Sequence, residues 1–435
     1  MTTALNEPTA SGAARKTGPN EPRLLPRTPE DLRAHLARFG PAPYRGGPGL
    51  LIGDVEASGL TGRGGAAFPV HRKLAVVAQA RGRKVIVANG AESEPASRKD
   101  AALLRLAPHL VLDGLQLAAE AVGAREARLY LHPGVSPEIL RALAERSAAG
   151  VDRLDVTIAE APPRFLAGQE TALVNRLGGG PALPTFAPPR VSERGLRGAP
   201  TLVQNVETLA HLALIARFGP RWFRAAGTAA EPGSMLTTIH QATIHQAHGQ
   251  WQVTEAEIGT PLRNLLSTQH EAQALLVGGY HGSWLPTPQA TNLTLDNATL
   301  NPHGAAVGAG VLAALPADRC GLAELARVTR YLAAESAGQC GPCLNGLPAI
   351  AGALAELAGP RPRRQAREDA ERWAGLVTGR GACHHPDGTV RFVRSGLTVF
   401  AAELSRHEKG QCSAKTRRPF LPLPDGTPTR EEDWT

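Results

Sequence analysis

The chain contains few of the features that mark secreted, membrane or nucleic-acid-binding proteins. It has 5 cysteines among 435 residues, and this odd number argues against a disulfide framework. Aromatic residues make up only 4%, so the scattered arginines have no stacking platform for nucleic acid beside them. No apolar run is long enough to cross a bilayer, and residues 1–22 show no signal-peptide pattern. We therefore expect a cytoplasmic protein that binds no nucleic acid and does not insert into a membrane.

Lysine is scarce as well, although the chain is basic. The 47 basic residues exceed the 39 acidic ones and give a net charge of +8, yet only 6 of them are lysine. A basic surface without a nucleic-acid motif suits an acidic protein partner, because opposite charges steer the encounter.

The apolar pattern divides the chain into five segments. Residues 1–27 are rich in small residues and proline and are predicted to be a disordered arm. Residues 28–230 alternate short apolar strands with helices, which is typical of a wound, largely parallel α/β sheet. Residues 231–320 indicate a small α+β module, 321–412 a helical domain, and the proline-rich residues 413–435 a disordered tail.

Individual elements follow from apolar spacing and helix-capping residues. The predicted strands are residues 84–88, 127–131, 154–159, 235–245, 250–258 and 274–277, with a turn at 248–249. The predicted helices are residues 68–80, 101–122, 137–149 with Ser136 as N-cap, a capped helix from Thr260, 322–334, 347–358, 364–378 and 395–407.

A glycine-rich loop precedes the first clear helix. It reads Gly62-Arg63-Gly64-Gly65, which is not the Gly-x-Gly-x-x-Gly order of a standard dinucleotide site. Glycines let backbone N–H groups approach a phosphate closely, and the following helix N-terminus favours negative charge. The other interpretation is a tight turn with packing glycines.

Three polar segments follow predicted strands or precede helices. The segment from Asn89 to Pro95 holds Glu92, Ser93 and Glu94 after the first strand, where open α/β sheets bind ligands. Glu170 and Asn205 each stand near a predicted helix start. Each segment by itself is equally compatible with a solvated loop.

Three cysteines have the spacing of metal ligands. Cys340 and Cys343 form a Cys-x-x-Cys pair, and Cys383 follows 40 residues later. A four-iron cluster ordinarily uses four thiolates, but the position that would complete a Cys-x-x-Cys-x-x-Cys run is Ala337. Cys320 and Cys412 have no partner at a useful spacing.

Several occupants of the three-cysteine site stay open. One is a [4Fe-4S] cluster whose fourth ligand is missing or is not cysteine, and another is a [3Fe-4S] or labile cluster. Zinc bound by three cysteines and a histidine is a third, and thiols without metal a fourth. The candidate fourth ligands are Glu335, Ser336, His384 and His385.

In this order, the segments resemble the NADH-oxidising flavoprotein subunit of respiratory complex I and its relatives in NAD-linked hydrogenases and formate dehydrogenases. Five family motifs recur between Leu50 and His407, from the glycine-rich loop to Glu-Ser-Ala-Gly-Gln-Cys-Gly-Pro-Cys. The resemblance implies an α/β fold with a Rossmann-like FMN domain, a ubiquitin-like β-grasp module and a C-terminal helical bundle that carries an iron–sulfur cluster.

Matching positions carry the implied site residues. The residues matched to the FMN site are Gly62, Arg63, Gly64, Gly65, Lys73, Asn89, Glu92, Ser93 and Asn205. Those matched to the nicotinamide nucleotide are Phe68, Glu94, Glu170 and Phe186, and the cluster ligands are Cys340, Cys343 and Cys383. The chain departs from the family pattern at Ala91, Phe165, Gln169, Leu183 and Ala337.

The resemblance implies an oxidoreductase that takes hydride from NAD(P)H onto FMN. Electrons would then leave singly through the cluster to a ferredoxin-like protein or another electron-transfer subunit, and no catalytic base is expected because the flavin supplies the chemistry. The departures leave a second interpretation open. The chain could be a non-catalytic or partner-fed subunit that kept the scaffold, with zinc in place of the cluster.

Overall fold

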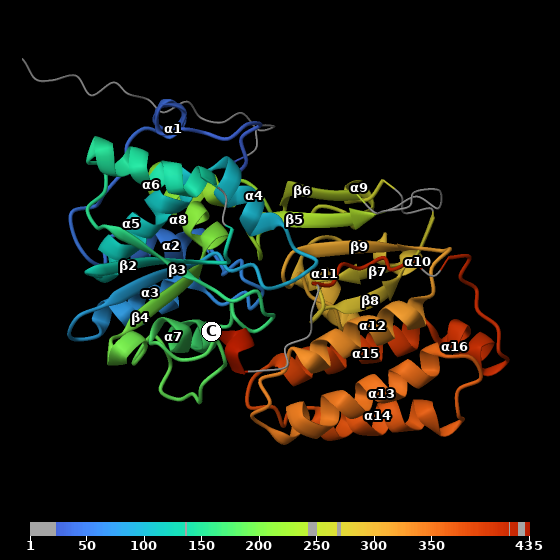
Figure 1. Ribbon diagram of the computed structural model, residues 1–435. Coiled ribbons are helices and arrows are strands. Elements are labelled where there is room, and N and C mark those ends of the chain that lie inside the picture. The colour runs from blue at the N-terminus through green and yellow to red at the C-terminus, as the bar shows by residue number, and fades with distance from the viewer. Residues whose placement is uncertain (1–22, 135–136, 242–249, 268–270, 417, 425–430) are drawn as a thin grey trace, which may run out of the picture.

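The computed structural model describes residues 23–134, 137–241, 250–267, 271–416, 418–424 and 431–435. Three parts are visible in Figure 1: a first α/β unit in blue and green, a second sheet in yellow, and a helical bundle in orange and red beneath that sheet. The expected Ser136 cap, the turn at 248–249 and residues 1–22 of the expected arm lie outside the described residues.

The first sheet has four strands, β1 (Val85–Asn89), β2 (Glu126–Leu131), β3 (Val156–Glu160) and β4 (Thr201–Asn205), in the order β3-β2-β1-β4. All its pairings are parallel, which confirms the α/β prediction. Side chains of β1 alternate, so that Ile86 and Ala88 join the main core while Val85 and Val87 join a smaller core on the other face.

Helices cover this sheet because their apolar stripes need burial. The elements are α1 (Leu32–Phe39), α2 (Ile52–Ser58), α3 (Val70–Gln79), α4 (Lys99–Leu106), α5 (Pro108–Val122), α6 (Pro137–Ala149), α7 (Glu170–Leu177) and α8 (Val206–Arg224). The prediction of one helix over 101–122 was wrong. Pro108 disfavours helical geometry at the residue before it, and Ala107 is non-helical with φ −132° and ψ 52°, which separates α4 from α5.

The second sheet has the order β6-β5-β9-β7-β8. Its strands are β5 (Ser234–Gln241), β6 (Gln250–Glu257), β7 (Ala272–Val277), β8 (Ser283–Pro286) and β9 (Val311–Pro316), and α9 (Leu262–Leu265), α10 (Thr287–Ala290) and α11 (Asn297–Leu300) lie beside it. β5 and β9 are parallel, and the other pairs are antiparallel. The expected hairpin of β5 and β6 is confirmed, whereas the helix from Thr260 shortens to one turn and β8 and β9 were not predicted.

The bundle contains α12 (Gly321–Ala334), α13 (Leu347–Ala358), α14 (Gln365–Val377), α15 (His385–Val399) and α16 (Ala401–Glu408). The first three were predicted, but the helix expected over 395–407 was wrong because two helices, α15 and α16, meet at Phe400. α15 begins at His385 although its sequence has weak helix formers. Burial of Val390, Phe392 and Val393 stabilises it against the second sheet and α12.

The expectation of a disordered tail from residue 413 was wrong for the described part. Phe420 and Leu421 are buried, and their N–H groups donate to the Glu324 carboxylate at 3.0 and 2.9 Å. Trp434 is 6% exposed, and its carbonyl accepts from Ala182 at 2.7 Å, so the chain end lies beside α7 (Figure 1). Leu24, in the expected arm, is also buried in the main core. Local composition predicted disorder here because it cannot show that apolar side chains between prolines pack into a core formed by distant elements.

Across the part of the chain that the structure describes, no helix is both long and apolar enough to span a membrane.

Candidate functional site

Many predicted site residues line one cavity of about 500 Å³. It opens where β1 and β4 end, at Asn89 and Asn205, and is closed by loops of the second sheet and the start of α15. The predicted residues in its wall are Gly64, Gly65, Asn89, Glu92, Ser93, Glu94, Asn205 and Cys383. The predicted residues outside its wall are Gly62, Arg63, Phe68, Lys73, Glu170, Phe186, Cys340 and Cys343.

The glycine-rich loop presents backbone to this cavity. Gly62 donates to the Phe68 carbonyl at 2.9 Å and closes the loop ahead of α3. Gly65 has a φ of +104°, a conformation that residues with a Cβ rarely adopt. The Arg63 side chain does not face the cavity; it is buried and donates to Thr61 Oγ1 at 2.9 Å and to the Pro232 carbonyl at 3.5 Å. Arg63 therefore braces the loop.

The segment after β1 is held by side-chain hydrogen bonds. Asn89 donates to the Gly168 carbonyl at 2.8 Å, and Gly168 N–H donates to Ser93 Oγ at 2.9 Å. A Cβ on Gly168 would lie 2.8 Å from Ser93 Oγ, so only glycine fits there. The Glu92 carboxylate accepts from the backbone N–H groups of Asp100 and Ala101, both at 3.1 Å, and stabilises the start of α4.

Lys99 is a buried cation in the cavity wall that sequence reasoning missed. Its Nζ lies 2.7 Å from Asp100 Oδ1 and 2.9 Å from Glu207 Oε2. Burial opposes ionisation of Glu207, but Lys99 and His211 outweigh it and lower the pKa of Glu207 to about 2. Burial raises the pKa of Asp100 to about 6 despite Lys99. The sequence feature that could have revealed this cation is the Lys99-Asp100 pair, which stands four residues after Pro95, the end of the acidic segment.

Glu94 lies where the first unit meets the second sheet. Its carboxylate accepts from Tyr280 N–H at 2.8 Å and Ala96 N–H at 3.1 Å. A Cβ on Gly279 would come within 2.6 Å of Glu94 Oε2, which shows how closely the second sheet covers this side chain. Burial raises the pKa of Glu94 to about 7, and the two N–H donors oppose that shift only partly.

Glu94→Gln should make stability less dependent on pH. Because the folded-state pKa of Glu94 is raised, its contribution to stability is fully present below its ordinary value of 4.5 and is lost as pH rises through about 7. Relative to the wild type, Glu94→Gln should therefore gain about 1–3 kcal/mol in unfolding free energy between pH 5 and pH 8. Chemical denaturation of both proteins across this range measures the difference; a constant difference would contradict the raised pKa.

The predicted nucleotide contacts lie outside the cavity wall, apart from Glu94. Lys73 Nζ forms an ion pair with Glu170 Oε1 at 2.9 Å, at the start of α7. Phe68 is 39% exposed and Phe186 is 87% exposed. Gln169, a departure from the family pattern, caps α7 by accepting from the N–H groups of Thr171 and Ala172 at 2.8 and 2.9 Å.

The three predicted metal ligands come together between the bundle helices. Cys343 is 2% exposed in a tight turn that leads into α13, and Cys383 stands just before α15. Burial raises the pKa of Cys343 to about 12, and the neighbouring Cys340 and Cys383 thiols add to this while Ser336 opposes it. Three thiols in one poorly solvated place are a donor set that a cationic metal centre would stabilise as thiolates. Cys383 also lines the 500 Å³ cavity.

The structure separates the candidates for a fourth ligand. His385 uses both ring nitrogens, since Nε2 lies 2.8 Å from the Leu332 carbonyl and Nδ1 lies 3.0 Å from His281 Nε2. The Glu335 carboxylate accepts from Phe165 N–H at 2.9 Å and from Arg164 at 3.3 Å. His384 is exposed, and Ser336 interacts with Cys343. Ser336 and His384 are therefore the candidates whose donor atoms are not already committed in this way.

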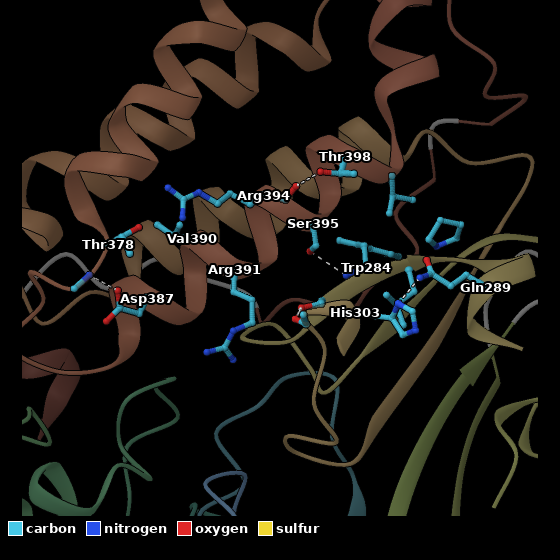
Figure 2. A pocket seen from close by; sticks show the side chains of 16 residues that line it. Trp284, Gln289, His303, Thr378, Asp387, Val390, Arg391, Arg394, Ser395 and Thr398 are labelled. Atoms are coloured by element: carbon cyan, nitrogen blue, oxygen red, sulfur yellow. Dashed lines mark hydrogen bonds between the residues drawn. The ribbon is translucent and has the colours of Figure 1, made fainter. Parts of the chain in front are cut away.

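A larger hollow of about 860 Å³ lies between α15 and the second sheet (Figure 2). Figure 2 shows Arg391, Arg394 and Ser395 on α15, with Trp284 and His303 on the second sheet and its loops. Trp284 N–H donates to Ser395 Oγ at 3.0 Å. Arg391 and Asp387 line both hollows. The wall of the larger hollow contains neither the glycine-rich loop nor a cluster cysteine, so it is not the predicted site.

Comparison with known proteins agrees with this arrangement. Residues 55–214 match the family model of the Nuo51 FMN-binding domain, and residues 323–407 match that of the NADH-ubiquinone oxidoreductase-F iron–sulfur binding region. A chain of the NAD⁺-reducing [NiFe]-hydrogenase in the H₂-reduced state superposes with a TM-score of 0.73 at 27% identity, over 85% of this chain. This chain spans only 63% of the length of that hydrogenase chain.

Relatives of nearly equal extent are also found. The F subunit of the NADH-quinone oxidoreductase of Streptomyces coelicolor is 30% identical over 384 residues, which cover 84% of each chain. The corresponding protein of Mycobacterium tuberculosis is 30% identical over 401 residues, covering 86% of this chain and 88% of its own length. The match extends through both family regions and the cavity between them, and the chain therefore belongs to the family of NADH-quinone oxidoreductase F subunits.

Proposed function

We propose that this chain takes hydride from NAD(P)H onto bound FMN and passes electrons singly through an iron–sulfur cluster to a partner subunit. One observation carries the proposal: a single cavity has the glycine-rich loop and the segment after β1 on one side and Cys383 on the other. A flavin in this cavity would lie directly beside a cluster ligand.

The cavity suits a flavin nucleotide. Its volume of about 500 Å³ falls in the range of cofactor pockets. Gly64 and Gly65 offer backbone without side chains in the way of a phosphate. Asn89 and Asn205 add amide groups at the ends of two neighbouring strands. We propose these residues, with Glu92 and Ser93, as the FMN site.

The roles of the chain's own groups are positional. Bound FMN would supply hydride acceptance and one-electron release. Gly62 and Arg63 hold the loop in shape, and the Lys99–Glu207 ion pair keeps the cavity wall rigid. Each Glu94 carboxylate oxygen accepts one backbone N–H and keeps a second lone pair, which can accept a hydrogen bond from a ribose hydroxyl. Phe68, Glu170 and Phe186 are proposed as nucleotide contacts and Lys73 as an FMN contact. These roles require the Lys73–Glu170 ion pair to accommodate the ligands.

We also propose that the acceptor is another electron-transfer subunit, as in the complexes to which the relatives' names refer, and more specifically a ferredoxin-like protein. The net charge of +8 would steer an acidic acceptor. A peripheral place in such a complex fits the proposal.

Mixing the purified holoprotein with NADH in a stopped-flow instrument tests the proposed function. Flavin absorbance should bleach within one turnover, and iron–sulfur absorbance should fall afterwards as electrons move on. Lack of bleaching with both NADH and NADPH would favour the alternative, a partner-fed subunit that has lost nucleotide oxidation. The Lys73–Glu170 ion pair favours this alternative, because two residues matched to FMN and nucleotide contacts bind each other instead.

A further inference from the structure

A second group of potential metal ligands lies at the opposite end of the helical bundle from the three-cysteine site. It consists of Cys320, Glu403, His407 and Cys412, whose ligand atoms all lie within 4.8 Å of one another. The first three are buried and Cys412 is exposed. Sequence spacing did not reveal this group, because Cys320 is 87 positions from His407 along the chain.

Two distances between ligand atoms of this group match those of a tetrahedral metal site. Cys320 Sγ lies 3.5 Å from His407 Nε2, and His407 Nε2 lies 3.3 Å from Glu403 Oε1. Around tetrahedral zinc, ordinary bond lengths place sulfur and nitrogen about 3.6 Å apart and nitrogen and oxygen about 3.4 Å apart. The Cys320, His407 and Glu403 ligand atoms therefore have the spacing that zinc requires across these two distances, and Cys412 lies within 4.8 Å of each of them.

The surrounding contacts orient the ligands. His407 Nδ1 lies 3.1 Å from the Leu357 carbonyl, so this nitrogen donates and leaves the lone pair of Nε2 facing the other three residues. Cys320 is the N-cap of α12, and its sulfur accepts from Ala323 N–H at 3.4 Å, which fixes the direction of the side chain. Glu403 and His407 are four residues apart on α16 and thus share one face of that helix.

We propose that Cys320, Glu403, His407 and Cys412 form a structural zinc site. Two thiolates, an imidazole and a carboxylate are ligands that zinc accepts, and four protein ligands close the coordination sphere, as in structural sites. Glu403 Oε1, the oxygen beside His407, also accepts from Ser413 N–H at 2.8 Å, and a carboxylate oxygen has a second lone pair for a metal. Glu403 Oε2 lies 4.0 Å from Arg406 Nε.

The site would anchor the C-terminal segment. Cys412 lies just before residues 413–416 and 418–424, of which Phe420 and Leu421 pack against Glu324 of α12 and the bundle core. A metal bond at Cys412 would join this segment to both α12 and α16. The proposed zinc is independent of the proposed flavin chemistry.

Metal analysis of the full-length protein, purified without chelators, tests the site. The wild type should hold about one zinc per chain in addition to iron, and Cys412→Ser should lose at least about nine-tenths of it. Iron and flavin should stay unchanged in Cys412→Ser, because Cys412 is exposed and far from both. Glu403→Gln provides a second variant, which should bind zinc more weakly in competition with a chelator.

Cys383→Ser is the matched control. It should lose iron and keep zinc, which separates this site from zinc bound at the three-cysteine site. Zinc that disappears in Cys383→Ser but persists in Cys412→Ser would overturn the proposal, as would protein that takes up no Zn²⁺ on titration. A Cys320–Cys412 disulfide in anaerobically purified protein, detected by mass spectrometry, would also overturn it.

Discussion

Cys343→Ser should remove most of the cluster iron and lower electron delivery to the acceptor by roughly 100-fold, while NADH still bleaches the flavin. Cys343 is the most buried of the three proposed ligands, and its loss would leave two cysteines, Cys340 and Cys383, to hold the cluster. Iron analysis and stopped-flow absorbance measure the two effects separately. Unchanged iron content would show that Cys343 is not a ligand.

Ala337→Cys should make the cluster more resistant to loss in air. A fourth thiolate would hold an iron that otherwise depends on a weaker ligand or none, so loss of the cluster in air should slow by about tenfold or more. Iron release followed by EPR and absorbance measures the rate. No gain would mean that a fourth ligand is already in place, and Ser336→Ala and His384→Ala would then identify it, since His385 and Glu335 are committed to other partners.

Gly114→Ala should lower the unfolding free energy by about 3 kcal/mol and the melting midpoint by about 3 °C. Gly114 lies inside α5, where the helix packs on α8. A Cβ there would stand 2.0 Å from the Leu209 carbonyl oxygen, and backbone cannot move aside as a flexible side chain can. The two helices would have to separate. Thermal unfolding followed by circular dichroism measures the shift.

Gly352→Ala is the control for this substitution. Gly352 also lies inside a helix, α13, but a Cβ there would meet no atom within 4 Å. The same chemical change should therefore stabilise the protein by about 0.5–1 kcal/mol through helix propensity alone. Equal effects at the two positions would show that the close packing of α5 on α8 contributes nothing.

Motifs whose residues lie within a few positions of one another could be predicted from the sequence. The loop at Gly64 and Gly65, the acidic segment at Glu92 and the Cys340–Cys343 pair each carry their chemistry within a few consecutive residues. The strand and helix patterns around them are similarly local, because hydrophobic period and capping depend on neighbours along the chain. These features also carried the family resemblance.

Features that depend on distant residues could not be predicted. Lys99 becomes part of the cavity wall through ion pairs that include Glu207. In the tail, Phe420 and Leu421 are buried because Glu324 and the bundle core receive them. α15 begins at His385 through packing on the second sheet rather than through its own helix propensity.

The fold class, the position of the glycine-rich loop ahead of a helix and the metal-ligand spacing of three cysteines could all be read from the amino-acid sequence alone. Only the tertiary structure decided which of the predicted residues share a cavity and which fourth ligands are already engaged. It alone brought Cys320 and Cys412 together with His407. The physical reason is that side-chain chemistry can be read from composition, whereas burial and proximity arise when separate elements pack to remove their apolar faces from water.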